Sequence, residues 1–282
     1  MLADDEARRL LGPALAWARR EDVGDLHLLV DAGDGDLARR AAAFSDPPAV
    51  WRVEGRGLEP ARPVPLPEVP TPPPSADGLA DVLRAAGAEV VVEHGVVAGE
   101  VLGLEVARVV GDGDDVRIEV GVGRHDREAF AAVHGDLPTA DALAEAVAAV
   151  RRHRYQGAPP HALGRLAPER WLRHRVVNEP GLVGVEHLEP VAPAVPRDSL
   201  KATVPAPALG RDDSGEEVVA VCSTGIDLDL VPAAADARLA HAPSARLLLV
   251  VPERDDHPVT RALAASLADP AEMAAVPDDW RG

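Results

Sequence analysis

The sequence predicts a mixed α/β fold in which a central antiparallel meander lies between an N-terminal and a C-terminal strand–helix unit. Apolar residues alternate with polar ones across residues 89–122, and a glycine- and aspartate-rich tract at 111–115 interrupts them, which predicts strands joined by a tight turn. On both sides of this stretch, a short apolar run precedes an alanine- and arginine-rich segment, which is typical of a strand followed by a helix.

Composition argues against several classes of protein. Only 2% of the residues are aromatic although 46% are hydrophobic, so Ala, Val and Leu fill the core and few rings are available to stack on bases or sugars. Lys201 is the single lysine; its proline-rich surroundings argue against a Schiff-base enzyme, and no Walker phosphate loop is present. A net charge of -18 argues against nonspecific nucleic-acid binding.

The same composition predicts a cytoplasmic location. Cys222 is the single cysteine, which excludes an internal disulfide and suits a reducing compartment. We interpret it as a small buried residue, with a nucleophile as the alternative. No stretch approaches the roughly eighteen apolar residues of a membrane helix, and the acidic start has the wrong charge for a signal peptide. We therefore expect a soluble protein without a membrane segment.

Two proline-rich segments divide the chain. Residues 59–75 predict an extended linker, and residues 190–210 predict a second connector. The three units that they separate are an N-terminal α/β unit at 1–58, a central meander with helices at 76–189, and a C-terminal α/β unit at 211–282.

The N-terminal unit is predicted from hydrophobic periodicity. An amphipathic helix is expected over residues 3–20, a buried strand over 26–30, a helix over 36–44 and another strand over 49–53. The turn Asp31–Asp36 lies between a strand and a helix, where phosphate-binding loops lie, but its aspartates would repel phosphate.

The central unit is predicted to contain strands at 90–97, 100–110 and 116–122, followed by a helix from His125 onward. Thr139 is expected to cap a further helix that extends to Arg154. In the C-terminal part, the predicted helices lie at 166–177, 233–241 and 259–267, and the predicted strands at 218–222 and 247–251.

Two segments of the chain resemble each other. Leu26–Pro47 and Ala245–Pro270 both contain an apolar strand, an acidic turn, an alanine- and arginine-rich helix and then Asp-Pro. We hypothesise an internal repeat in which the two ends of the chain are equivalent α/β units. The alternative is a similarity of composition alone, because alanine-rich helices resemble one another easily.

Four glutamates are expected on neighbouring strands of the meander, namely Glu93, Glu100, Glu105 and Glu119. Carboxylates that converge from adjacent strands are typical of Mg²⁺ or Mn²⁺ sites. The order of these elements resembles the core of the PD-(D/E)XK nucleases: a strand that carries an acid is followed by a turn, by a strand that contains Ile118-Glu119-Val120, and by a helix. This resemblance implies that Glu105 and Glu119 are the catalytic acids.

The lysine of that nuclease motif falls on Gly121, so the motif is broken, and Arg124 would have to stabilise the developing phosphorane charge in its place. The alternative interpretation is that the glutamates line the solvent-exposed face of a half-buried sheet. Mg²⁺ or Mn²⁺ is expected only under the nuclease hypothesis; otherwise no cofactor is predicted.

One basic segment stands out in this acidic chain. Between residues 151 and 175 a single acid, Glu169, accompanies seven arginines, which are Arg151, Arg152, Arg154, Arg165, Arg170, Arg173 and Arg175. One interpretation is a surface that contacts phosphate or nucleic acid, with Arg151, Arg152, Arg154, Arg170, Arg173 and Arg175 as the residues that bind the partner. The other is a cationic face that pairs with the protein's own carboxylates.

Three functional hypotheses follow, and they leave open whether the protein is an enzyme. The first is a non-catalytic interaction or scaffold protein with a degenerate nuclease-like core. The second is a metal-dependent phosphodiesterase or nuclease that uses Glu105 and Glu119. The third is a small-ligand or nucleotide binder at the crevices beside Asp31–Asp36 and Pro252–His257. A protein partner or self-association is expected in preference to nucleic acid.

Overall fold

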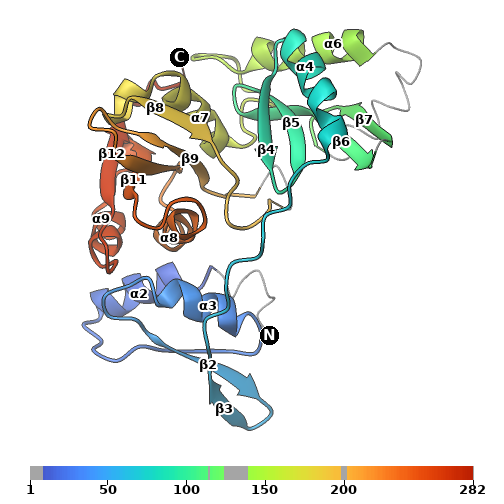
Figure 1. Ribbon diagram of the computed structural model, residues 1–282. Coiled ribbons are helices and arrows are strands. Elements are labelled where there is room, and N and C mark those ends of the chain that lie inside the picture. The colour runs from blue at the N-terminus through green and yellow to red at the C-terminus, as the bar shows by residue number, and fades with distance from the viewer. Residues whose placement is uncertain (1–8, 114, 124–138, 198–201, 282) are drawn as a thin grey trace.

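A computed structural model describes residues 9–113, 115–123, 139–197 and 202–281, and it shows a mixed α/β protein with three separate open sheets (Figure 1). The predicted fold class is therefore confirmed, including the central antiparallel meander between two strand–helix units. Within the described residues, no helix combines the length and the apolar character needed to cross a membrane.

The N-terminal unit consists of α2 (Leu11–Arg20), β1 (His27–Val30), α3 (Asp34–Ala41), β2 (Ala49–Glu54) and β3 (Gly57–Pro60). β1 and β2 are parallel, because α3 carries the chain back across the sheet, whereas β3 returns as an antiparallel hairpin. The expected strands and the second helix are present, and β3 is an addition to them. The helix predicted over residues 3–20 begins only at Leu11, and residues 3–8 of that prediction lie outside the described residues.

The first proline-rich segment leaves β3 and reaches the central unit in extended form (Figure 1). Its beginning contacts α3, because the Val64 amide donates to Gly35 O at a distance of 3.2 Å and the Val64 carbonyl accepts a hydrogen bond from Arg39. The segment ends at η1 (Pro74–Ala76), which continues into α4 (Asp77–Ala85).

The central sheet contains β4 (Glu89–Glu93), β5 (Val96–Val101), β6 (Leu104–Asp112) and β7 (Asp115–Val120) in sequential antiparallel order. The strands predicted over residues 90–97 and 100–110 are both wrong, because the first stretch folds back at His94–Gly95 and the second at Leu102–Gly103, so each contributes to two strands. Both residues of each turn have positive φ, and this is the twist that two-residue hairpins require.

One face of the central sheet is covered by α4 and by α6 (Thr139–His153). The helix predicted from Thr139 is confirmed. The helix predicted from His125, and Arg124 with it, lie outside the described residues.

The C-terminal unit contains the helices α7 (Pro168–Asn178), α8 (Leu230–His241) and α9 (Pro258–Ala265), together with the short helices η2 (Pro180–Val183) and η3 (Glu253–Asp255). Its five strands lie in the order β12-β11-β10-β9-β8. They are β8 (His187–Pro190), β9 (Ala206–Arg211), β10 (Glu217–Cys222), β11 (Arg246–Pro252) and β12 (Glu272–Val276).

The sheet of the C-terminal unit extends across the predicted division at residue 190. β8 precedes the proline-rich connector and β9 ends it, yet the two strands are hydrogen-bonded neighbours. α7 packs on these strands and on β10. The C-terminal unit therefore begins at α7, about twenty residues before the end of the predicted central unit.

The internal repeat is present in the backbone. Each terminal unit has a helix, a strand, a second helix and a parallel strand, in α2-β1-α3-β2 and in α8-β11-α9-β12. The two parallel strand pairs also have matching registers. Leu29 on β1 lies opposite Trp51 on β2, and Val250 on β11 lies opposite Ala274 on β12. Leu29 and Val250 are therefore equivalent positions.

The two repeats meet around a local two-fold arrangement of backbone hydrogen bonds. Phe44 and Leu267, which follow α3 and α9, form an isolated antiparallel bridge. The Ser45 amide donates to Ser266 O, and the Ala268 amide donates to Ala43 O, each at a distance of 2.9 Å. Helices α2 and α3 pack against α8 and α9 around this bridge, and their apolar sides form one continuous core (Figure 1).

Candidate functional site

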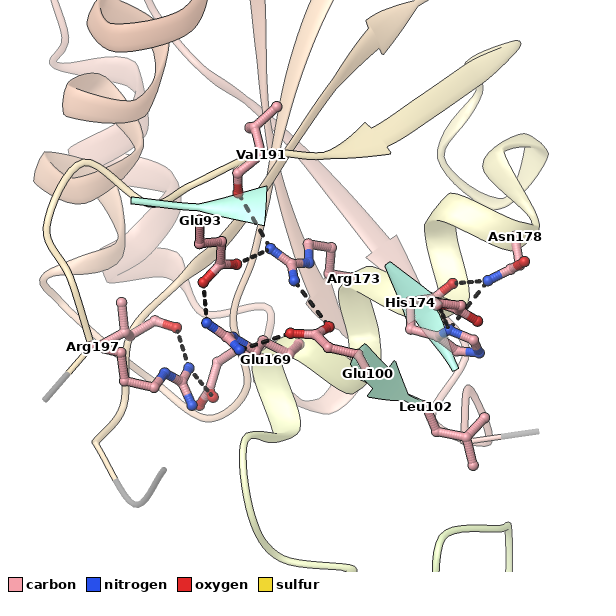
Figure 2. Close-up of polar contacts among 12 residues, drawn as sticks. Glu93, Glu100, Leu102, Glu169, Arg173, His174, Asn178, Val191 and Arg197 are labelled. Atoms are coloured by element: carbon pink, nitrogen blue, oxygen red, sulfur yellow. Dashed lines mark hydrogen bonds and ion pairs between the residues drawn. The ribbon is translucent and has the colours of Figure 1, made fainter. Parts of the chain in front are cut away.

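The predicted carboxylates share one face of the central sheet. Strand pairing places Glu89 opposite Glu100, and Glu100 opposite Glu105. The pairing of β5 with β6 shifts its register between Gly99 and Glu100. Because of this shift, Glu105 lies on the same face as Arg108 and as Glu119, which pairs with Arg108. The expectation that acids from neighbouring strands lie together is therefore correct for the backbone. Around Glu93 and Glu100 this face is directed toward α7, as Figure 2 shows, whereas the Glu119 side chain on β7 is 38% exposed.

Two of these glutamates are paired with arginines from α7 (Figure 2). Glu100 Oε1 accepts from Arg170 Nη1 at 2.7 Å, and its Oε2 accepts from Arg173 Nη2 at 3.2 Å. Glu93 Oε1 accepts from Arg173 Nη1 at 2.8 Å, and its other oxygen accepts from Arg170. Arg173 and Glu100 are only 1% and 3% exposed, so this four-residue network is buried.

Electrostatics favour the ionised forms of Glu93 and Arg173. Burial raises the pKa of Glu93, but the charges of Arg173 and Arg170 outweigh it, and the resulting pKa lies below the ordinary value. Burial lowers the pKa of Arg173, but Glu100 and Glu93 outweigh it and leave that pKa raised. Two arginines balance two glutamates, so a metal at Glu93 and Glu100 would have to displace two guanidinium groups.

The remaining nuclease-like residues lie at the other side of the same face. Glu105 is 5% exposed and accepts two hydrogen bonds from Arg108, at 2.7 and 2.8 Å, whereas Glu119 pairs with Arg117 at 2.8 Å. Within the part of the chain that the structure describes, no three His, Cys, Asp or Glu side chains are grouped so as to hold a metal ion.

The members of the basic segment have different environments. Arg170 and Arg173 contact the protein's own carboxylates, as described above. Arg175 pairs with Glu179 one turn further along, and Arg151 and Arg152 are exposed, with Arg151 donating to Gly87 O. Of the arginines predicted to contact a partner that are named here, only Arg151 and Arg152 are exposed at the surface.

Arg154 joins the central and C-terminal units without a carboxylate. Its guanidinium donates to the carbonyls of Leu163, Leu166 and Leu102 and lies 4.3 Å from the ring centre of Trp171. Burial lowers its pKa to about 9. Arg154 is therefore a structural residue.

A second buried pair, Arg197 and Glu169, was not predicted. Arg197 Nη2 lies 3.6 Å from Glu169 Oε2 and donates to Val204 O, but its Nε and Nη1 have no hydrogen-bond partner among the described residues. Burial lowers the pKa of Arg197 and raises that of Glu169. No local sequence signal marks this pair, because its members are separated by a helix, a strand and part of the connector.

A third buried network joins the two repeats. Asp236 on α8 accepts from Arg39 Nε at 3.1 Å and from Arg40 Nε at 2.6 Å, and Arg40 Nη1 donates to Asp229 at 3.0 Å. Burial raises the pKa of Asp229 to about 6, and Asp227 and Asp236 contribute in the same direction. The units thus meet through buried arginine–carboxylate contacts on both sides of the C-terminal sheet.

Asp229 gives a pH dependence with a definite sign. Its folded pKa lies above the unfolded value of about 3.9, so between these values the folded state binds more protons and the free energy of unfolding falls as pH rises. From pH 4 to pH 7 we expect wild type to lose about 2 kcal/mol relative to Asp229→Asn, since each pKa unit corresponds to about 1.4 kcal/mol. Urea denaturation measures this difference, and parallel pH profiles of the two proteins would contradict it.

Within the described parts of the chain, no element covers the outer face of the N-terminal sheet. Its side chains are His27 and Leu29 from β1, Trp51 and Val53 from β2, and Leu58 from β3. Leu29 is 48% exposed and Leu58 is 51% exposed, whereas Leu28 and Val50 on the inner face are buried against the helices. The indole of Trp51 donates to His27 Nδ1 and the two rings stack, which fixes the centre of this face.

Comparisons with protein-family models, with curated proteins and with solved structures find no match for this chain.

Proposed function

We propose that the protein is a non-catalytic interaction protein whose outer N-terminal sheet face binds a basic amphipathic helix of another protein. A single observation carries this proposal. Leu29 and Val250 occupy equivalent positions in the two repeats, yet Leu29 is 48% exposed and Val250 is fully buried. The N-terminal repeat therefore presents an apolar face whose counterpart is covered.

The covered counterpart indicates what kind of segment fits. In the C-terminal unit, that face packs against α7 and η2, with Trp171 and Trp280 in edge-to-face contact. α7 carries three arginines and one acid, so it is a basic helix with an apolar side formed by Trp171, Leu172 and Val176. The net charge of -18 favours a basic partner for this chain.

A second copy of the chain is a poor source of that helix. In each copy Trp171, Leu172 and Val176 are at most 3% exposed, so a protomer could offer its α7 only by unfolding its own C-terminal unit. The network of Glu93 and Glu100 is consistent with a scaffold role, because its two acids are paired with Arg170 and Arg173. The remaining nuclease-like acids, Glu105 and Glu119, also have arginine partners.

A synthetic peptide of residues 166–178 tests this proposal as a basic amphipathic helix. We expect it to bind the full-length protein in fluorescence anisotropy, and we expect Leu29→Glu to weaken binding at least tenfold, because the change places a charge in the apolar contact. The peptide does not compete for the C-terminal site, where the tethered α7 has a far higher effective concentration.

Leu239→Glu is the matched control, because Leu239 is also a leucine and also 48% exposed, but it lies on α8. The control should bind the peptide as wild type does. Equal weakening by both variants, or no binding to wild type, would remove the proposal. Light scattering of the free protein provides a separate check, since a dimer that Leu29→Glu dissociates would mean that a second copy occupies this face.

A further inference from the structure

The internal repeat gives the molecule two clefts at equivalent places. The first, of about 390 Å³, is lined by α2, by the loops before β1 and after α3, and by α9 of the other repeat. The second, of about 350 Å³, is lined by α8, by the loops before β11 and after α9, and by α3, with a contribution from the first proline-rich segment. Neither of the crevices predicted from the sequence, at 31–36 and 252–257, contributes to the lining of the first cleft.

The charged residues of the two clefts can be matched one to one. Helices α2 and α8 share the sequence pattern L-x-P-A-x-A-x-A-R, which ends at Arg19 in the first helix and at Arg238 in the second. Asp46 and Asp269 each lie two residues beyond the antiparallel bridge that joins the repeats, and each precedes a proline. Arg19 and Asp46 in the first cleft are therefore the counterparts of Arg238 and Asp269 in the second.

These counterparts differ in whether they contact each other. Arg238 is 8% exposed and donates to Asp269 Oδ2 at 2.7 Å and to the Asp269 carbonyl oxygen at 2.9 Å. Arg19 and Asp46 are both exposed, and neither side chain forms an ion pair or a hydrogen bond with another described residue. The first cleft thus contains an arginine and a carboxylate that are each available to a ligand.

The first cleft also has an apolar floor. Phe44 and Leu263 are only 3% and 2% exposed, and the half-buried Leu15 joins them from α2. Asp25, on the loop before β1, is a second exposed acid in the lining. The cleft therefore combines one cationic and two anionic side chains with an apolar floor formed by Leu15, Phe44 and Leu263.

We propose that this cleft binds a free amino acid with an apolar side chain. Its carboxylate pairs with Arg19, its ammonium group pairs with Asp46 and Asp25, and its side chain lies on the apolar floor. Arginine and a carboxylate form charge-assisted hydrogen bonds, and an ammonium group supplies three donors, so one small zwitterion satisfies both ends of the cleft. The cleft shares only His27 with the outer sheet face, and amino-acid binding does not depend on helix binding there.

Calorimetric titration of the full-length protein with L-leucine tests this site, and three analogues each remove one feature of the ligand. L-leucinamide lacks the carboxylate, N-acetyl-L-leucine lacks the ammonium group, and glycine lacks the apolar side chain. We expect each analogue to bind at least about tenfold more weakly than leucine, because each leaves one part of the cleft without its partner.

Two variants assign the contacts. Arg19→Met should abolish the preference for leucine over leucinamide, and Asp46→Asn should reduce the preference for leucine over N-acetyl-leucine. Arg20→Met is the matched control and should bind leucine as wild type does, because this neighbouring arginine is exposed, pairs with Glu21 and does not line the cleft.

All three substituted positions are exposed, so the variants are expected to fold, and circular dichroism establishes this. No binding of leucine at millimolar concentration, equal affinity for leucine and its three analogues, or an unchanged preference in Arg19→Met would each overturn the proposal.

Discussion

Arg173→Met is expected to lower the free energy of unfolding by about 3–5 kcal/mol, because it leaves the buried carboxylates of Glu93 and Glu100 without one of their two arginines. Methionine fills similar space, so the loss comes from the charge and not from a cavity. Chemical denaturation at neutral pH measures the change.

Two further variants identify the cause of that loss. Arg173→Met combined with Glu100→Gln should recover a large part of the stability, because it restores the balance of one arginine and one glutamate. Arg175→Met, at a half-buried position of the same helix whose ion pair with Glu179 is partly exposed, should change stability by less than about 0.5 kcal/mol. If Arg173→Met were as mild as Arg175→Met, the network would not join the two units.

Gly103→Ala is expected to cost about 3–5 kcal/mol, since two effects add at this position. Gly103 has a φ of +73° in the turn between β5 and β6, which disfavours any side chain. A Cβ there would also lie 2.2 Å from the Arg170 carbonyl oxygen, so the central sheet could not approach α7 as closely.

Gly55→Ala separates these two effects. Gly55 also has a positive φ, +60°, in the turn between β2 and β3, but no atom lies within 4 Å of the position of its Cβ. We expect this variant to lose only about 1 kcal/mol, from backbone strain alone. Equal losses in urea denaturation of the two variants would show that close contact with α7 contributes nothing.

The fold could be predicted where the pattern is local. β1, β10 and β11 are short apolar runs, and the helix from Thr139 has a regular apolar periodicity, so the sequence predicts each at nearly its observed position. β8, β9 and β12 were missed because their sequences, HLEP, APALGR and EMAAV, contain proline, alanine or charge and form strands only beside their partners.

The candidate site was predictable in its components but not in its pairing. The acids of the meander and the basic segment were each identifiable from the sequence. Their contact joins residues 70 to 80 positions apart, and it depends on how α7 packs on the central sheet. The exposure of the outer face of the N-terminal sheet is likewise not predictable from local sequence, because it depends on which elements pack on each repeat.

The most direct test of the proposed function is the thiol reactivity of Leu29→Cys toward a maleimide, with and without the peptide of residues 166–178. Cys222 does not interfere, because it is buried and burial raises its pKa to about 12. We expect Leu29→Cys to react rapidly and the peptide to protect it, while Val250→Cys stays unreactive and Leu239→Cys reacts equally with and without peptide. Slow reaction of Leu29→Cys in the free protein, or no protection by the peptide, would contradict the proposal that this face is an open binding site for a helix.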